Sequence, residues 1–349
     1  MDTRVFLARC DTYEQADSAV ERVLDAFGGA AAILAGRKRV LVKPNLIMPK
    51  KPDAAATTHP AVVAAVCAAF VKAGADVAII DSTGGPHSKA VLKMLYSRCG
   101  MEDAARQSGA RLSYDTRSRT VETPDGRVIQ KITLLAPVLG AELVVSVGKA
   151  KTHGMMSMTG CSKNLFGCVP GLGKPNLHRK YPNRKDFAGM LVDVCERINP
   201  GFSVLDGVWG MEGAGPTGGD PKHLRVIAGG FNPYAIDLAQ CHLMGLRRDS
   251  VYSLAEAASR GLAPEAPEQL TWLGDDPEPL RTQFLPAIKH KKDAVPEILP
   301  NCAGCGDCAR ICPQKCIAIQ DKKAVVDGDS CIRCYCCHEF CPAKAIMLG

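Results

Sequence analysis

Over the first 262 residues, short apolar runs alternate with longer stretches that have helical periodicity. The runs that predict buried strands cover residues 5–9, 39–42, 77–80, 143–147, 202–205 and 224–228. A helix is expected to open at Pro60, a favoured first-turn residue, and to reach about residue 73. Strands that alternate with helices predict an α/β fold with a mostly parallel sheet and flanking helices.

Shorter signals place further elements and the domain boundaries. Asp11 and Glu14 resemble a capping box before a helix, and the Pro-Asp-Gly sequence at 124–126 predicts a turn between two short strands. The run 269–274 is compatible with one more strand of the sheet, whereas prolines are dense from 263 to 300. We therefore expect an α/β domain at 1–274, a proline-rich linker at 275–300 and a small α+β domain at 301–349.

Ten of the 17 cysteines lie from residue 301 onward, in two copies of the pattern C-x2-C-x2-C-x3-C-P. In such a repeat, three closely spaced thiolates bind one 4Fe–4S cluster, and the fourth, before proline, reaches the other cluster. The pattern predicts a bacterial-type two-cluster ferredoxin domain with two 4Fe–4S clusters. A pair of zinc sites is the alternative, but zinc would not require two interlocked copies that end in Cys-Pro. The first ligand set is Cys302, Cys305, Cys308 and Cys341, and the second is Cys331, Cys334, Cys337 and Cys312.

The most unusual charge pattern lies between residues 148 and 185, where eight Lys and Arg, two His and six Gly occur without an acidic residue. The basic residues are Lys149, Lys151, Lys163, Lys174, Arg179, Lys180, Arg184 and Lys185. Lysines and free backbone amides in a glycine-rich loop suit a phosphate or carboxylate. The alternative is a solvated basic face that docks the cluster-bearing tail, which its thiolate-bound clusters would make acidic.

Composition limits the other classes of function. A pI of about 8.6 and 5% aromatic residues argue against a nucleic-acid binder. The longest uncharged apolar stretch near the start, 61–71, is too short to cross a bilayer, and no leader sequence is evident, so we expect a cytoplasmic protein that does not bind membranes. Motifs for Walker-type nucleotide binding, dinucleotide binding and the hydrolase elbow are absent from the sequence.

Three segments together carry a family resemblance: Lys-Pro-Asn-Leu at 43–46, the run from Lys149 to Gly167, and the glycine-rich stretch 206–219. The chain resembles the domain-of-unknown-function family 362, whose members often carry a C-terminal two-cluster ferredoxin module. The resemblance implies a site at Lys43, Lys151, His153, Lys163, Asn164, Asp206 and Glu212. Cys161 departs from the family pattern, which leaves open whether Cys161 and Cys168 bind a further metal.

The leading hypothesis is an iron–sulfur redox protein, and an oxidoreductase activity is compatible with it. Its ferredoxin tail would receive electrons from a redox partner protein and pass them to a small anionic substrate or cofactor on the α/β domain. Lys43, Lys149, Lys151, Lys163 and Asn164 would bind the anion. His153 would handle protons with Asp206 or Glu212, although these two acids are as readily explained as caps of the glycine loop.

Two alternatives remain open. The protein could be a non-enzymatic electron carrier or accessory protein whose basic face docks a redox partner. It could instead be a maturation factor that delivers a metal or cluster through Cys161 and Cys168. The first alternative predicts salt-sensitive association with a protein and no small-molecule binding, and the second predicts iron transfer to an apo acceptor.

Overall fold

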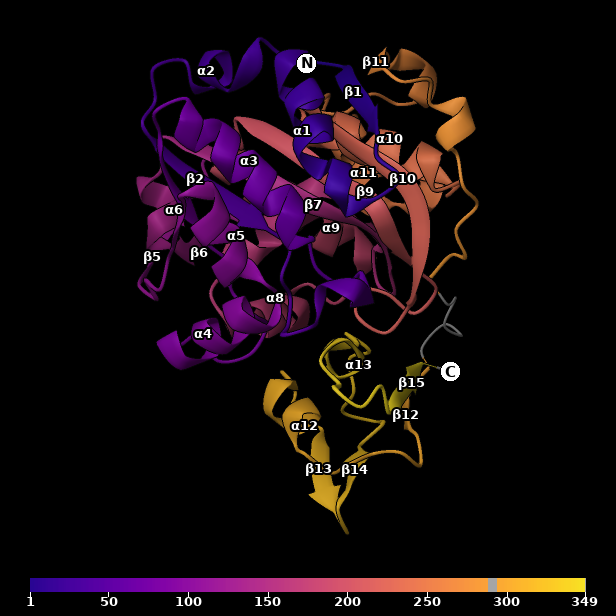
Figure 1. Ribbon diagram of the computed structural model, residues 1–349. Coiled ribbons are helices and arrows are strands. Elements are labelled where there is room, and N and C mark those ends of the chain that lie inside the picture. The colour runs from indigo at the N-terminus through magenta and orange to yellow at the C-terminus, as the bar shows by residue number, and fades with distance from the viewer. Residues whose placement is uncertain (288–293, 349) are drawn as a thin grey trace.

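A computed structural model describes residues 1–287 and 294–348 of the 349-residue chain. Its centre is a nine-stranded sheet in the order β11-β1-β10-β9-β7-β2-β3-β4, with β8 paired to β7 (Figure 1). The strands are β1 (Arg4–Arg9), β2 (Arg39–Pro44), β3 (Asp76–Ile79), β4 (Arg111–Leu112), β7 (Leu143–His153), β8 (Ser157–Thr159), β9 (Phe202–Glu212), β10 (Asp220–Gly230) and β11 (Thr271–Gly274).

The sheet is mostly parallel, as the sequence predicts. β9, β7, β2, β3 and β4 pair in parallel in that order, and β11 is parallel to β1. β10 runs antiparallel to β1 and β9, and β8 antiparallel to β7. The carboxyl ends of β2, β3, β7 and β9 therefore meet at one edge of the sheet, where ligands bind in folds of this kind.

Helices cover both faces of the sheet and bury two separate apolar cores. Because side chains alternate along a strand, Val145 and Val147 of β7 belong to one core and Val144 to the other. The first core packs under α1 (Ala16–Asp25), α2 (Gly29–Leu34), α3 (Pro60–Lys72), α4 (Lys89–Arg98) and α5 (Met101–Ser108). The second packs under α7 (Cys161–Asn164), α9 (Arg184–Ile198), α10 (Pro233–Leu243) and α11 (Tyr252–Ser259). The two remaining helices of the described α/β domain are α6 (Ala136–Gly140) and α8 (Gly173–Lys180).

The structure confirms two of the local signals in the sequence and corrects a third. α3 begins at Pro60 as predicted, with the His59 side chain accepting a hydrogen bond from the Ala61 amide. The predicted turn at 124–126 joins β5 (Ser118–Glu122) to β6 (Lys131–Leu135), which pair antiparallel. The capping box is wrong by one position, because the Gln15 side chain, not Glu14, accepts from the amides of residues 11 and 12.

The segment predicted as a linker is structured at both of its ends. Leu280 and Phe284 are buried in the second core of the α/β domain. The Thr282 and Phe284 amides donate to the carbonyls of Leu243 and Met244 at the end of α10. At its other end, β12 (Pro296–Ile298) pairs antiparallel with β15 (Ile346–Leu348) of the cysteine-rich region. The predicted linker, 275–300, thus contacts the α/β domain through Leu280, Thr282 and Phe284 and the cysteine-rich region through β12, and residues 288–293 lie outside the described part.

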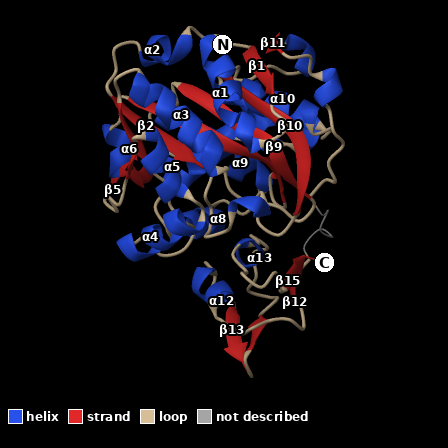
Figure 2. Cartoon of the chain, viewed as in Figure 1, coloured by secondary structure: helices blue, strands red, loops and turns tan. Residues whose placement is uncertain are grey.

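The cysteine-rich region, residues 296–348, forms a small module below the α/β domain (Figure 2). It contains α12 (Asp307–Ile311), α13 (Cys336–Glu339) and a second antiparallel pair, β13 (Ile317–Gln320) with β14 (Lys323–Val326). Its own small core contains cysteines together with Ile317, Ala324 and Ile346. α13 is the element nearest the α/β domain, and the β13–β14 hairpin points away from it (Figure 1).

No helix in residues 1–287 and 294–348 is long and apolar enough to cross a membrane.

Candidate functional site

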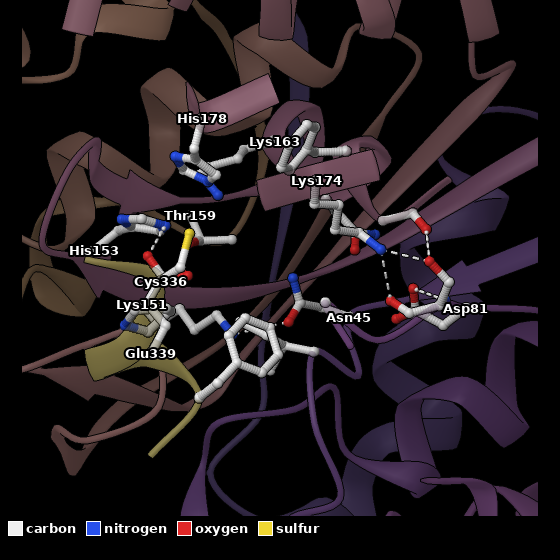
Figure 3. Close-up of a pocket in the computed structure, with 18 of the residues that line it drawn as sticks. Asn45, Asp81, Lys151, His153, Thr159, Lys163, Lys174, His178, Cys336 and Glu339 are labelled. Carbon is white, nitrogen blue, oxygen red and sulfur yellow. Dashed lines mark hydrogen bonds and ion pairs between the residues drawn. The ribbon is translucent and has the colours of Figure 1, made fainter. Parts of the chain in front are cut away.

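A cavity of about 70 Å³ lies where the carboxyl edge of the sheet meets the C-terminal module (Figure 3). Its walls come from the ends of β2, β3 and β7, from α7 and α8, and from α13 of the module. The polar residues that line it are Lys43, Asn45, Asp81, Ser82, Lys151, His153, Thr159, Lys163, Asn164, Lys174, His178, Cys336 and Glu339. Five of the residues predicted from the sequence are thus brought together here: Lys43, Lys151, His153, Lys163 and Asn164.

Lys43 is a buried lysine with a carboxylate of its own. Its Nζ atom lies 2.8 Å from Asp81 Oδ1, and both side chains are almost fully buried. It also donates to Asn164 Oδ1 at 3.2 Å, while Asn164 Nδ2 returns a hydrogen bond to the Lys43 carbonyl at 2.7 Å. This closed set of contacts fixes the end of β2 against α7.

Three further lysines of the cavity form no ion pair with a carboxylate anywhere in the described chain. Lys151, fully buried, donates to Asn45 Oδ1 at 2.8 Å and to the Ala56 carbonyl at 2.6 Å. Half-buried Lys163 lies over the Phe166 ring at 5.7 Å. Lys174 donates to the Ser82 and Thr83 carbonyls at 3.1 and 2.9 Å.

Burial makes the charged forms of these lysines costly. It lowers the pKa of Lys151 well below its ordinary value, and the neighbouring Lys163 and Lys149 lower it further. It also lowers the pKa of Lys163 and brings the pKa of Lys174 to about 7. An anion in the cavity would favour their protonated forms.

His153 and Glu339 face each other across the junction between the two parts of the protein (Figure 3). His153 Nδ1 accepts hydrogen bonds from the amides of Met155 and Met156 at 3.2 and 3.4 Å. The ring hydrogen is therefore on Nε2, which lies 3.4 Å from Glu339 Oε1. Burial lowers the pKa of His153 well below its ordinary value and raises the pKa of Glu339 to about 7, so the histidine is a neutral hydrogen-bond donor.

Two buried polar atoms in the cavity wall have no hydrogen-bond partner among the described residues. They are His178 Nδ1 and Thr159 Oγ1. Burial lowers the pKa of His178 to about 3, and its ring stacks on Phe187 with centroids 4.2 Å apart. Buried polar groups in proteins are nearly always hydrogen-bonded, so both atoms indicate a missing partner in the cavity.

The other three predicted site residues do not line this cavity. Lys149 and Asp206 form a fully buried ion pair at 2.8 Å, and the Tyr13 hydroxyl donates to Asp206 at 3.2 Å. Glu212 accepts a hydrogen bond from the Leu285 amide at 2.8 Å and lies 3.7 Å from Lys222. The acid that His153 contacts is therefore Glu339, in place of the predicted Asp206 or Glu212.

Sequence reasoning did not select Asp81, Lys174, His178 or Glu339 as site residues. Lys174 and His178 belong to the acid-free basic run, and Asp81 follows a strand and precedes a glycine loop, so weak signals existed for these three. Glu339 lies inside the second cysteine motif, where the cysteine pattern gives no reason to single it out. The basic run itself divides, since Arg179, Lys180, Arg184 and Lys185 are exposed.

The two predicted cluster-ligand sets form two groups of neighbouring thiols in the module. We call Cys302, Cys305, Cys308 and Cys341 the first seat, and Cys312, Cys331, Cys334 and Cys337 the second seat. In the first seat, burial raises the pKa of Cys308, and Cys305, Cys341 and Cys302 add to this. The second-seat thiols line one common cavity. Each group thus has the cysteines that a 4Fe–4S cluster requires.

Cys161 and Cys168, considered for a further metal, are fully buried. Burial raises the pKa of Cys168 to about 12, and Cys161 Sγ lies 3.5 Å from the Val204 carbonyl. No group of three or more His, Cys, Asp and Glu side chains in residues 1–287 and 294–348 is arranged to hold a single metal ion. Both thiols pack as small apolar side chains.

Residues 40–242 match the family model described as a domain of unknown function, DUF362. The chain belongs to this family. It is also 30% identical over 275 residues to a thylakoid-associated protein of Synechocystis sp., an alignment that covers 76% of this chain and 81% of that protein.

The cysteine-rich end matches ferredoxin-like proteins. It is 43% identical over 47 residues to the pyruvate synthase subunit PorD of Methanothermobacter marburgensis, covering 14% of this chain and 54% of the subunit. It is 29% identical over 73 residues to a polyferredoxin-like protein of Methanocaldococcus jannaschii, covering 17% and 42%. The C-terminal region of this DUF362 protein is therefore ferredoxin-like, which indicates iron–sulfur clusters.

Among solved structures, the chain resembles the lactate racemase apoprotein of Thermoanaerobacterium thermosaccharolyticum, with a TM-score of 0.39 and 15% identity. The likeness covers 59% of this chain and 50% of the racemase. A Thermotoga maritima protein matches with a TM-score of 0.34 and 11% identity, over 58% and 52% of the two chains. The chain spans about half the length of these two proteins, and at these scores the likeness carries no statement about activity.

Proposed function

We propose that this DUF362 protein is an iron–sulfur redox protein that binds a small anion between its α/β domain and its ferredoxin-like module. Two 4Fe–4S clusters would occupy the first and second seats and supply single electrons. The observation that carries the proposal is that one cavity is lined both by lysines without carboxylate partners and by Cys336, Glu339 and Phe340 from within the second cysteine motif.

The charge of the cavity supports an anionic ligand. Lys151, Lys163 and Lys174 are buried or half-buried and hydrogen-bond only to neutral oxygens or lie over a ring, which does not offset the cost of burying an ammonium group. An anion would provide that compensation. His178 and Thr159 would add hydrogen bonds from the same wall.

The size of the cavity limits the ligand. A cavity of about 70 Å³ is well above the about 10–15 Å³ that one ordered water needs, so it has room for a small polyatomic ligand. The proposed class is a small oxyanion or short carboxylate.

The residues of the chain divide into holding and binding groups in this proposal. Lys43 with Asp81, and Lys149 with Asp206, hold the strand ends in place. The ammonium groups of Lys151, Lys163 and Lys174 bind the anion, and His153 donates its Nε2 hydrogen within the cavity. Phe340 closes the wall on the module side and excludes water from the ligand.

The proposal is tested with sulfate, whose charge does not change near neutral pH. Sulfate binding to the anaerobically purified full chain is measured by calorimetry, and the reduction potentials of the clusters are measured with and without it. Lys163→Met should weaken binding by about tenfold or more, the loss of one charge-assisted contact. Lys180→Met, at an exposed lysine of the same basic run, should not.

Equal sulfate binding by wild type and Lys163→Met would contradict the proposed anion site. Binding without any shift in either potential would leave a ligand site but contradict its link to the clusters.

One observation favours the alternative of an electron carrier that docks a partner. Arg179, Lys180, Arg184 and Lys185 are exposed and form a positive surface outside the cavity. Under this alternative, reversing these charges would abolish a salt-sensitive association with a redox protein while sulfate binding stays intact. The burial of Cys161 and Cys168 gives the maturation-factor alternative no accessible thiol pair.

A further inference from the structure

The two seats differ in their position relative to the anion cavity. Cys336, between two ligands of the second seat, is buried and lines two cavities at once. One is the cavity that contains Cys312, Cys331, Cys334 and Cys337, and the other is the anion cavity. The second seat and the anion cavity are thus separated by the thickness of one side chain.

We propose that the second seat serves the anion cavity and that the first seat is the entry point for electrons from an outside one-electron carrier protein. The inference rests on the proposed function. Each transfer oxidises the carrier by one electron and reduces the protein by one electron, and no bond is made or broken at either seat.

Contacts of α13 fix the second seat to the α/β domain. Thr217 Oγ1 donates to the Glu339 carbonyl at 2.6 Å, and the Glu339 carboxylate faces His153. The Phe340 ring lies directly against Gly84, where an added Cβ would be 2.0 Å from the ring carbon Cζ. Such close packing leaves the second seat little freedom to move relative to the cavity.

The first seat is more open to solvent. In the first seat Cys305 is exposed and Cys308 is buried, whereas in the second seat Cys331 and Cys337 are buried and no cysteine is exposed; the other two cysteines of each seat are half-buried. Cys341 of the first seat borders a different cavity, with Gly154 and Gly215, which contains none of Lys151, Lys163 and Lys174. An outside carrier can therefore approach the first seat from solvent more closely than the second.

One lysine lies near each seat, and replacing it should change the reduction potential of the cluster in that seat. Lys163 lies close enough to Cys336 and Glu339 for mutual electrostatic effects. Lys323 lies close enough to Cys302 for an electrostatic effect of the same kind on the first seat. A positive charge near a cluster favours its reduced, more negative form, so removing the charge should move the potential of the nearer cluster to a more negative value.

The test is an anaerobic redox titration of the full chain followed by electron paramagnetic resonance. Lys323→Met should lower the potential of one signal, which marks the first seat. Lys163→Met should lower the potential of the other signal by more than it lowers the marked one. Lys163→Arg, which keeps the charge, should give the wild-type potentials and shows that an altered fold is not the cause.

If both Met variants shift the same signal, or if Lys163→Met shifts the two signals equally or shifts neither, the order of the seats is wrong. The titration needs no ligand, so its outcome is independent of sulfate binding. A split response without sulfate binding would support the order of the seats and contradict the anion site. Sulfate binding without a split response would do the reverse.

Discussion

Two lysines that lie two positions apart on β7 are both fully buried and have opposite surroundings. Lys149 has a carboxylate of its own, Asp206, at 2.8 Å. Lys151 has only the amide oxygen of Asn45 and the carbonyl of Ala56. A buried cation with its own counter-ion forms a closed pair that holds structure, whereas one without a counter-ion leaves a charge for something else to balance. Under the proposed function, this difference places Lys149 in the scaffold and Lys151 in the anion site.

The register of β7 against β9 explains how neighbouring lysines come to differ. Lys149 is opposite Asp206, but Lys151 is opposite Met211, because the pairing shifts between them. Without that irregularity, Lys151 would lie opposite Val208, so in either register it has no acidic residue opposite it on β9. Bulges of this kind redirect side chains next to functional sites.

The largest effect is expected from breaking the closed pair. Asp206→Asn leaves the Lys149 ammonium buried without a counter-ion, which should lower the free energy of unfolding by about 3–5 kcal/mol. Urea unfolding of the anaerobic protein measures it. Glu212→Gln is the matched control, since Glu212 pairs with Lys222 only at 3.7 Å and should change stability by about 1 kcal/mol or less. Similar losses in both variants would contradict the distinction.

Exchanging each lysine for methionine should separate binding from stability. Lys151→Met should weaken sulfate binding by up to about 100-fold, near 2.7 kcal/mol. Lys149→Met should leave sulfate affinity within about twofold while destabilising the fold, because Asp206 becomes an unpaired buried carboxylate. Calorimetry and urea unfolding on the same samples give both quantities. A loss of affinity in Lys149→Met alone would reverse the two assignments.

The docking of the module should affect the site by a smaller amount. Gly84→Ala places a methyl group against the Phe340 ring. The loss of stability should lie at the lower end of the about 1–3 kcal/mol typical of overpacking. The substitution should also weaken sulfate binding, because it moves α13 away from the cavity. Gly85→Ala is the control, because its Cβ would meet nothing nearer than the Thr83 hydroxyl at 3.9 Å. Unchanged binding in Gly84→Ala would show that the module is not part of the cavity wall.

The smallest effect concerns pH. Burial lowers the pKa of Lys174 to about 7, so its ammonium is present below that pH and is lost above it, with Lys43, Asp81 and Lys163 around it. An anion binds the protonated form, so sulfate affinity should fall by about tenfold between pH 6 and pH 8. Lys174→Arg, charged throughout, should flatten the profile. A profile that rises with pH would exclude Lys174 from the site.

The sequence predicted which segments form the strands of the sheet better than it predicted where those strands end. β1, β2 and β3 are found where short apolar runs predicted them, and β11 confirms the weaker signal at 269–274. β7 and β9 extend six or seven residues beyond the predicted ends at 147 and 205. The extensions contain buried charged residues such as Lys149, Lys151 and Asp206. The hydrophobic pattern therefore ends several residues before the strand does.

The candidate site was predicted in part. Local sequence signals identify residues at the edge of the sheet, but they do not identify contacts made by a distant segment of the chain. Lys43, Lys151, His153, Lys163 and Asn164 converge because they follow or belong to elements at one edge of the sheet. Glu339 enters through the docking of α13, which no local spacing in the chain encodes. Alternation along β7 groups Lys149 with Lys151, and only the pairing with β9 separates them.

The antiparallel pairing of β12 with β15 has a practical consequence for expression of the protein. An affinity tag fused behind β15 would begin beside the strand that closes the cysteine module, near the cavity formed by Met347, Gly154 and Gly215. Met1 lies at the opposite end of the molecule, above the sheet and away from the module (Figure 1). An amino-terminal tag would therefore lie far from the cysteine module, whereas a tag behind β15 would begin beside it.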